Sequence, residues 1–122
     1  MVNNQPPTPP TCNLSNGISL STYDISGYTN QDPQNHADFD ALETNYAIDS
    51  LKFGSGIVDN INTTGSDNNP YQNNPDDKYL SIFDGYIYIP SAGTYRFAVN
   101  GDDAVEVILS QYYGWYLSLI HI

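Results

Sequence analysis

The chain has few positively charged residues. Three lysines and arginines stand against fourteen aspartates and glutamates, which gives a formal net charge of −11 at pH 7. Nucleic acids and anionic membrane surfaces are bound through basic patches, so this balance excludes both as predicted partners. The excess of carboxylates is compatible with cation binding, but the favoured interpretation is that it keeps an acidic extracellular protein in solution.

Cysteine is almost absent as well. Cys12 is the only one, so no disulfide can form within the chain. A catalytic cysteine needs a positioned base, for which His36 is the only credible histidine. Because Cys12 lies beside Pro9-Pro10-Thr11, in a segment that indicates a linker, a catalytic Cys12–His36 pair is disfavoured.

Long apolar runs are also missing. No stretch of 18 apolar residues occurs, so the sequence predicts no membrane insertion. Residues 1–6, MVNNQP, lack the basic and apolar regions of a signal peptide. This does not argue for a cytoplasmic protein, because we interpret the chain as a fragment of a longer one.

The residues that are abundant favour an all-β fold. Aromatic residues make up 13% of the chain, eleven of them tyrosine, while asparagine, aspartate, glycine and proline crowd the segments between apolar runs. This composition is typical of an all-β module with many loops. With 122 residues, the chain forms one domain at most.

Residues 83–109, FDGYIYIPSAGTYRFAVNGDDAVEVIL, carry the clearest pattern. Alternating apolar residues predict strands over Phe83–Ile89 and Thr94–Asn100, and a third from Val105 onward. Pro90–Gly93 and Asn100-Gly101 supply the two turns. On the first strand one face holds Phe83, Gly85, Ile87 and Ile89. On the second strand the residues expected to point inward are Tyr95, Phe97 and Val99, and the same alternation resumes at Val105, Val107 and Leu109.

One helix is predicted, over His36–Tyr46. Phe39, Leu42 and Tyr46 recur at three- and four-residue spacing and form an apolar stripe. Asn35 is the expected N-cap, and Asp38 lies near the positive end of the helix dipole.

The remaining strand signals are weaker. Ile18–Tyr23 alternates and predicts an opening strand, while Lys52–Phe53 and Ile57–Ile61 predict two short strands separated by Gly54-Ser55-Gly56. Asn62–Asp77 has no periodicity, and we interpret it as a solvated loop.

These patterns divide the chain into three parts. Residues 1–16 contain Gln5-Pro6-Pro7-Thr8-Pro9-Pro10 and predict a stiff linker that tethers the module to other domains of a larger chain. Residues 17–116 form the domain. Residues 117–122, LSLIHI, resemble the translated end of a sequencing-library adapter, so we exclude them from functional reasoning as a non-native tail. The alternative is a genuine final strand.

The string GYIYIPSAGTYRFAVNGDDAV, residues 85–105, carries a family resemblance. Its strand leading into Gly93-Thr94-Tyr95, followed by a strand leading into Asp102-Asp103, resembles the PA-fourteen domain, named for a fragment of anthrax protective antigen. The resemblance implies an antiparallel β-sandwich with one short helix. Members of this family usually continue past a Gly-Trp-Tyr such as Gly114-Trp115-Tyr116, so we expect the C-terminal strands to be missing.

The resemblance also implies a site. In sugar-binding members the two aspartates are joined by a cis peptide bond, and both carboxylates coordinate one Ca²⁺. The ion in turn coordinates vicinal sugar hydroxyls. Asp102 and Asp103 are thus the candidate metal ligands. Apart from the resemblance, Trp115 is a candidate for stacking on a sugar ring, although an aromatic cluster more often belongs to a core or an interface. Oxygen donors with no nearby cysteine or histidine suit Ca²⁺ better than Zn²⁺. The alternative is that the Asp pair only stabilises the turn through backbone amides.

The expected function is carbohydrate binding and adhesion, as a module of a bacterial secreted or cell-surface protein with a glycan as partner. The alternatives are a non-binding structural spacer and an accessory module of a glycoside hydrolase. The module itself is not expected to be an enzyme, because glycosidases place two carboxyl groups about 5–9 Å apart across a cleft. Asp102 and Asp103 share one turn, and Glu106 or Asp84 would oppose them only through an unforeseen tertiary arrangement.

Overall fold

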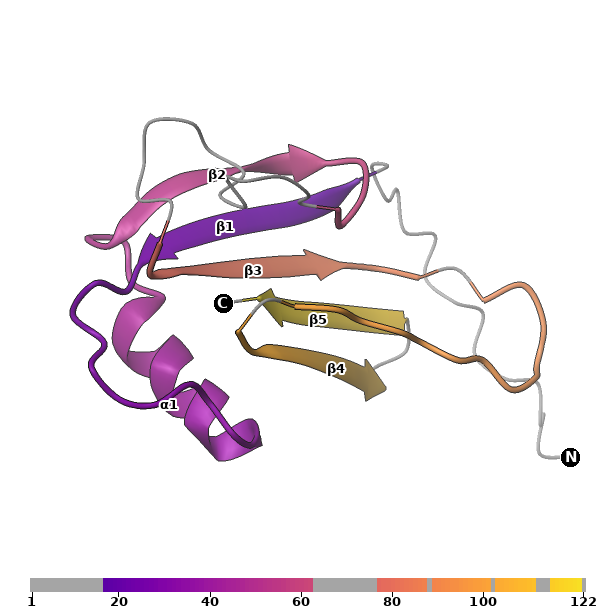
Figure 1. Ribbon diagram of the computed structural model, residues 1–122. Helices are drawn as coiled ribbons and strands as arrows, with labels where there is room; N and C mark the ends of the chain where they lie inside the picture. The colour runs from indigo at the N-terminus through magenta and orange to yellow at the C-terminus, as the bar shows by residue number, and fades with distance from the viewer. Residues whose placement is uncertain (1–16, 63–76, 88, 102, 112–114, 122) are drawn as a thin grey trace, which may run out of the picture.

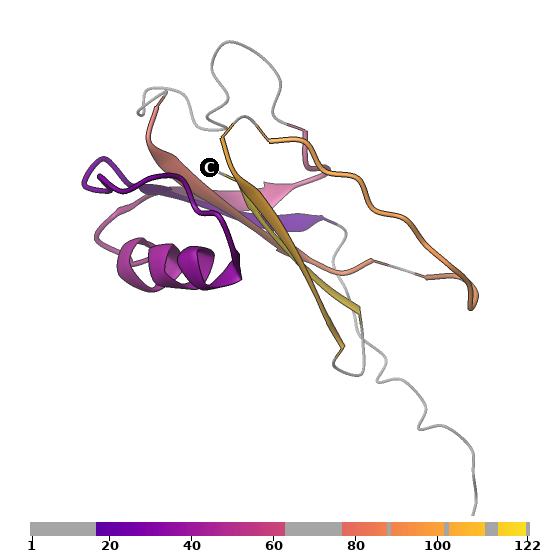
Figure 2. The ribbon, with the colours of Figure 1, turned by 60° about the horizontal axis from the view of Figure 1, so that its bottom comes forward.

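The computed structural model describes residues 17–62, 77–87, 89–101, 103–111 and 115–121. Its elements are β1 (Ile18–Asp24), α1 (His36–Tyr46), β2 (Lys52–Val58), β3 (Tyr79–Gly85), β4 (Val105–Gln111) and β5 (Trp115–His121). The five strands form one antiparallel sheet in the order β2-β1-β3-β5-β4, and α1 lies against one face of it (Figures 1 and 2). The predicted all-β, antiparallel class with one short helix is confirmed.

Helix α1 has the predicted bounds and the predicted cap. The side chain of Asn35 accepts a hydrogen bond from the backbone N–H of Asp38, with the two atoms 3.1 Å apart. This contact satisfies one of the N–H groups left unpaired in the first turn. Phe39 and Leu42 are buried against the sheet, and Tyr46 is half-buried. The three- and four-residue spacing of the apolar stripe therefore sets which side of the helix faces the sheet.

The centre of the sheet, formed by β1 and β3, is buried on both faces. Residues directly opposite each other on antiparallel strands share a face, so Tyr23 lies beside Leu80 on one face and Leu20 beside Phe83 on the other. The face beneath α1 holds the cluster Tyr23, Ile25, Phe39, Leu42, Leu80 and Ile82. On the opposite face, the buried pair of Leu20 and Phe83 is flanked by Ile18, Val58, Ile61, Val105 and Val107.

The prediction for β3 was wrong in its bounds. The strand begins at Tyr79 and ends at Gly85, rather than running over Phe83–Ile89. All five residues from Tyr79 to Phe83 are buried. A strand covered on both faces has no inside–outside alternation, so its first half carried no period-two signal.

The prediction of a strand over Thr94–Asn100 was also wrong. These residues belong to no strand, and Tyr95, Phe97 and Val99 are 43%, 48% and 50% exposed instead of pointing inward. The positions on either side of β3 in the sheet are taken by β1 and β5. The chain between β3 and β4 instead runs out beyond the end of the sheet and returns (Figure 1).

Strand β2 is continuous where two short strands were predicted. It runs through Gly54-Ser55-Gly56, and the residues from Gly54 to Val58 pair with β1. The register shifts between Thr22 and Tyr23, opposite the start of this glycine-rich stretch. Ladder hydrogen bonds need only backbone groups, so glycines can continue a strand at the sheet edge and tolerate the local irregularity.

Strand β4 begins at Val105, as predicted, but only part of its inward face is buried. Val105 and Val107 pack against the Leu20–Phe83 pair, whereas Leu109 is 54% exposed. Leu117–His121, part of the segment set aside as a tail, lie in β5 and pair with β3 and β4. That the segment is non-native stays a prediction, because a strand position does not report the origin of a sequence. Among the described residues, no helix is long and apolar enough to cross a membrane.

Candidate functional site

The turn that precedes β4 carries the predicted calcium ligands. Asp103 is exposed and lies two residues before Val105, the first residue of the strand. Asp102 lies outside the described residues. The convergence of the two carboxylates on one cation therefore stays a prediction. The described peptide bonds are all trans, and the bond joining Asp102 to Asp103 is not one of them.

Trp115, the predicted sugar-stacking residue, is the first residue of β5, where its backbone pairs with Gln111 of β4. The described structure does not extend to its side chain. Cys12 and most of the Asn62–Asp77 loop also lie outside the described residues, so the predictions made for them stay predictions.

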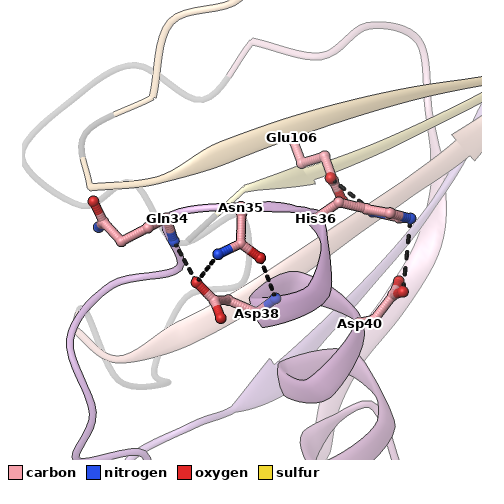
Figure 3. Close-up of polar contacts among 6 residues, drawn as sticks. All are labelled: Gln34, Asn35, His36, Asp38, Asp40 and Glu106. Atoms are coloured by element: carbon pink, nitrogen blue, oxygen red, sulfur yellow. Dashed lines mark hydrogen bonds and ion pairs between the residues drawn. The ribbon is translucent and has the colours of Figure 1, made fainter.

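The chain after Asp103 is anchored to both faces of the sheet. Ala104 packs against the cluster beneath α1, and Val105 packs on the opposite face. Glu106 then turns back toward α1, where its Oε1 lies 2.8 Å from Nδ1 of His36 (Figure 3). Because an ionised carboxylate only accepts hydrogen bonds, the ring N–H of His36 is the donor. The start of β4, and with it the acidic turn, is thereby tied to the first residue of the helix.

A second set of polar contacts holds the N-terminus of α1 in place. The backbone N–H of Gln34 and the side-chain amide of Asn35 both donate to Oδ2 of Asp38, at 3.0 and 2.9 Å (Figure 3). On the next turn, Oδ2 of Asp40 lies 3.6 Å from Nε2 of His36. His36 therefore lies between two carboxylates, one on its own helix and one on β4.

Negative charge accumulates where α1 meets the sheet. Burial raises the pKa of Glu43, and the nearby carboxylates of Asp84, Asp40 and Glu106 raise it further. Glu106 Oε2 is buried and has no hydrogen-bond partner among the described residues. Nevertheless, no three histidine, cysteine, aspartate or glutamate side chains in the described ranges are arranged to hold a metal ion. We interpret this region as a site of charge repulsion that the contact with His36 offsets in part.

Sequence reasoning missed the contact between His36 and Glu106. It considered His36 only as a base for Cys12, and Glu106 only as a carboxylate facing the Asp pair. The two residues are 70 positions apart, so no local pattern connects them. One signal was present: on a strand whose valines at 105 and 107 face one side, Glu106 must face the other.

Comparison with known proteins identifies the family. A family model described as the PA14 domain, the PA-fourteen domain of the resemblance above, matches residues 3–112. The match spans most of the chain, which therefore belongs to the PA14 domain family. No curated protein and no solved structure was found to match.

Proposed function

We propose that this chain is a carbohydrate-binding module of a larger secreted or cell-surface protein, in which Asp102 and Asp103 hold a calcium ion that contacts the glycan. The observation that carries the proposal is the position of Asp103 in a PA14 domain: it is exposed two residues before β4, and Ala104 and Val105, which follow it, pack on opposite faces of the sheet. Exposure places Asp103 at the surface, where an ion and a sugar can approach it. Anchoring reduces the entropy lost on binding.

The chemistry of the turn fits a hard cation. Carboxylate and backbone oxygens are the ligands that Ca²⁺ prefers, and no histidine or cysteine lies in residues 100–106, NGDDAVE. Calcium, when bound, supplies positive charge that coordinates neighbouring sugar hydroxyls. The chain itself supplies the two carboxylates and the tie between Glu106 and His36 that holds the start of β4.

The rest of the proposal follows from the charge and the N-terminal segment. A net charge of −11 disfavours anionic glycans, because like charges repel across a binding surface. The proline-rich residues 1–16 would act as a semi-rigid spacer to a neighbouring domain. No catalytic role is proposed for the module.

Calorimetry with Ca²⁺ alone tests the metal site. We expect Asp102→Asn and Asp103→Asn each to abolish calcium binding to the 122-residue chain, and to abolish calcium-dependent signals on a glycan array. Asp59→Asn is the matched control, since it removes the same charge from an exposed position after β2. Calcium affinity unchanged in both Asp-pair variants would mean that the pair only stabilises the turn.

The glycan array also separates a binding module from a spacer. A chain that binds calcium but no glycan on the array, with or without the ion, would favour a structural spacer.

A further inference from the structure

A polar cleft lies on the side of α1 that faces the loop before it. The cleft has a volume of about 770 Å³ and is open to solvent. One wall is the loop of residues 27–34, and the other is α1 from Asp38 to Tyr46. The volume falls within the range of about 300–1,000 Å³ that is typical of small-molecule sites. The acidic turn at Asp103 takes no part in it.

The loop wall is held in place by its own hydrogen bonds. The backbone N–H of Tyr28 donates to the carbonyl of Ile25, and the Tyr28 hydroxyl donates to the carbonyl of Gln31, both at 2.7 Å. The Tyr28 ring also meets the Tyr46 ring edge to face, with the centroids 5.9 Å apart. At the far end of the loop, Gln34 is tied to Asp38 of the helix. The cleft is therefore formed before any ligand arrives, which lowers the entropy cost of binding.

The lining favours a ligand rich in hydroxyl groups. Side chains with planar amide, carboxylate or phenol groups make up most of it, including Tyr28, Asn30, Asp32, Gln34, Asn45 and Tyr46. Amides and carboxylates pair with hydroxyls as donor and acceptor, and tyrosine combines an apolar ring with a polar tip. Tyr28, Gln34 and Asn45 each donate one hydrogen bond within the chain, and the second amide hydrogen and the amide oxygen of Gln34 and Asn45 are left to pair with a ligand. An anionic ligand would be repelled by Asp32 and Asp38.

The Tyr28 hydroxyl donates its one proton to the carbonyl of Gln31, so it can meet a ligand hydroxyl as a hydrogen-bond acceptor. Burial raises the pKa of its hydroxyl, and the charges of Asp38 and Asp32 raise it further. The phenol therefore keeps the proton that it donates to Gln31.

We propose that this cleft is a second saccharide subsite, which binds one or two units of a neutral sugar without calcium. It rests on the proposed function, since it assumes that the module binds glycans. It differs from the Asp102–Asp103 site in location and in requiring no cation. Two subsites on one chain would let a longer glycan bind at both, which raises the effective affinity without new contacts at either.

Nuclear magnetic resonance on the whole chain tests the proposal. Methyl glycosides of glucose, galactose and mannose are titrated in buffer containing EDTA, while the side-chain amide signals of Asn30, Gln31, Gln34 and Asn45 are followed. We expect saturable shifts for at least one glycoside, with a Kd on the order of millimolar, as for other weak single-site ligands. Methyl glucuronide, which carries a carboxylate, should give none.

Two variants show whether the shifts report this cleft. Ala41→Trp places a large ring into the cleft from an exposed helix position and should reduce the affinity at least tenfold. Thr44→Trp adds a similar ring on the same helix but outside the cleft, and should change nothing. Asn45→Ala should weaken binding several-fold without loss of folding, since alanine favours the helix. No saturable shift with any of the three glycosides overturns the proposal, as does an affinity that Ala41→Trp leaves unchanged.

The glycan array with and without EDTA separates this subsite from the calcium site. Signals that survive EDTA and disappear in Ala41→Trp support the subsite, even if no calcium-dependent signal exists. Signals that all require calcium and all survive Ala41→Trp overturn the subsite and leave the calcium-dependent function standing. An array with no signal under either condition overturns both.

Discussion

Replacing His36 with alanine tests how far the contact between α1 and β4 stabilises the domain. The two side chains differ in exposure, 62% for His36 and 15% for Glu106, and their closest atoms are 2.8 Å apart. A hydrogen bond to a charged group contributes about 1.5–3 kcal/mol. Because the His36 side of the contact is largely in water, we expect the free energy of unfolding to fall by about 1–1.5 kcal/mol, at or below the lower end of that range. Most of that loss arises because Glu106 is left mostly buried without its donor.

A double-mutant cycle isolates this contribution. Glu106→Met removes the carboxylate while keeping a chain of similar length, and should itself change the stability little, because losing the contact is offset by no longer burying a charge. In that background His36→Ala should cost almost nothing. The coupling energy should therefore be about 1 kcal/mol, and the helix-propensity change at position 36 cancels, since it occurs in both arms.

Urea denaturation of the four proteins, with the slope of the transition checked for constancy, gives the free energies. A coupling energy within about 0.5 kcal/mol of zero is ordinary additivity. That result would refute the reasoning, because it would mean that Glu106 is hydrated well enough not to need His36.

Two further predictions concern the core and the acidic region. Leu80→Ala should lower the free energy of unfolding by about 3 kcal/mol, because Leu80 is fully buried beneath α1. Ile57→Ala, at a 65% exposed position, should change the free energy of unfolding by no more than about 0.5 kcal/mol. Urea denaturation measures both, and equal effects would mean that the core lies elsewhere. Glu43→Gln should raise the Tm at pH 7, and this gain should vanish below about pH 4 in calorimetry across pH 3–8. The reason is that burial raises the pKa of Glu43 in the folded state, and Asp84, Asp40 and Glu106 raise it further. The protonated form of Glu43 therefore favours the folded state. This contribution to stability is fully present below the unfolded pKa of Glu43 and is lost as the pH rises through its folded pKa. A gain of the same size at both ends of the pH range would contradict this assignment.

The parts of the fold that were predicted correctly are those with local causes. Asn35 caps α1 through an atom three residues away, and the burial of Phe39 and Leu42 follows from their spacing on one helix face. The start of β4 at Val105 was readable because Gly101 and the Asp pair interrupt the chain just before it. Helix caps, helix stripes and turn residues act within a few positions, so a sequence displays them directly.

The errors arose where strands depend on distant partners. Residues 94–100 have the alternation of a strand, but the places beside β3 are taken by β1 and β5. Burial of β3 on both faces removed the alternation that would have marked its true start at Tyr79. An alternating pattern indicates that a segment could form a strand, but the segment joins a sheet only where a strand edge is free to pair with it.

The sequence by itself determined the all-β class, the capped helix, the strong negative charge and the Asp pair that carries the family resemblance, because each of these is a property of composition or of residues close together in the chain. Only the tertiary structure decided that β5 lies between β3 and β4, that Glu106 meets His36, and that the loop before α1 and the helix line a polar cleft. Those features depend on which surfaces are brought together when the sheet forms and the helix packs onto it. Residues 70 positions apart, such as His36 and Glu106, carry no mark of each other until that burial places their side chains within hydrogen-bonding distance.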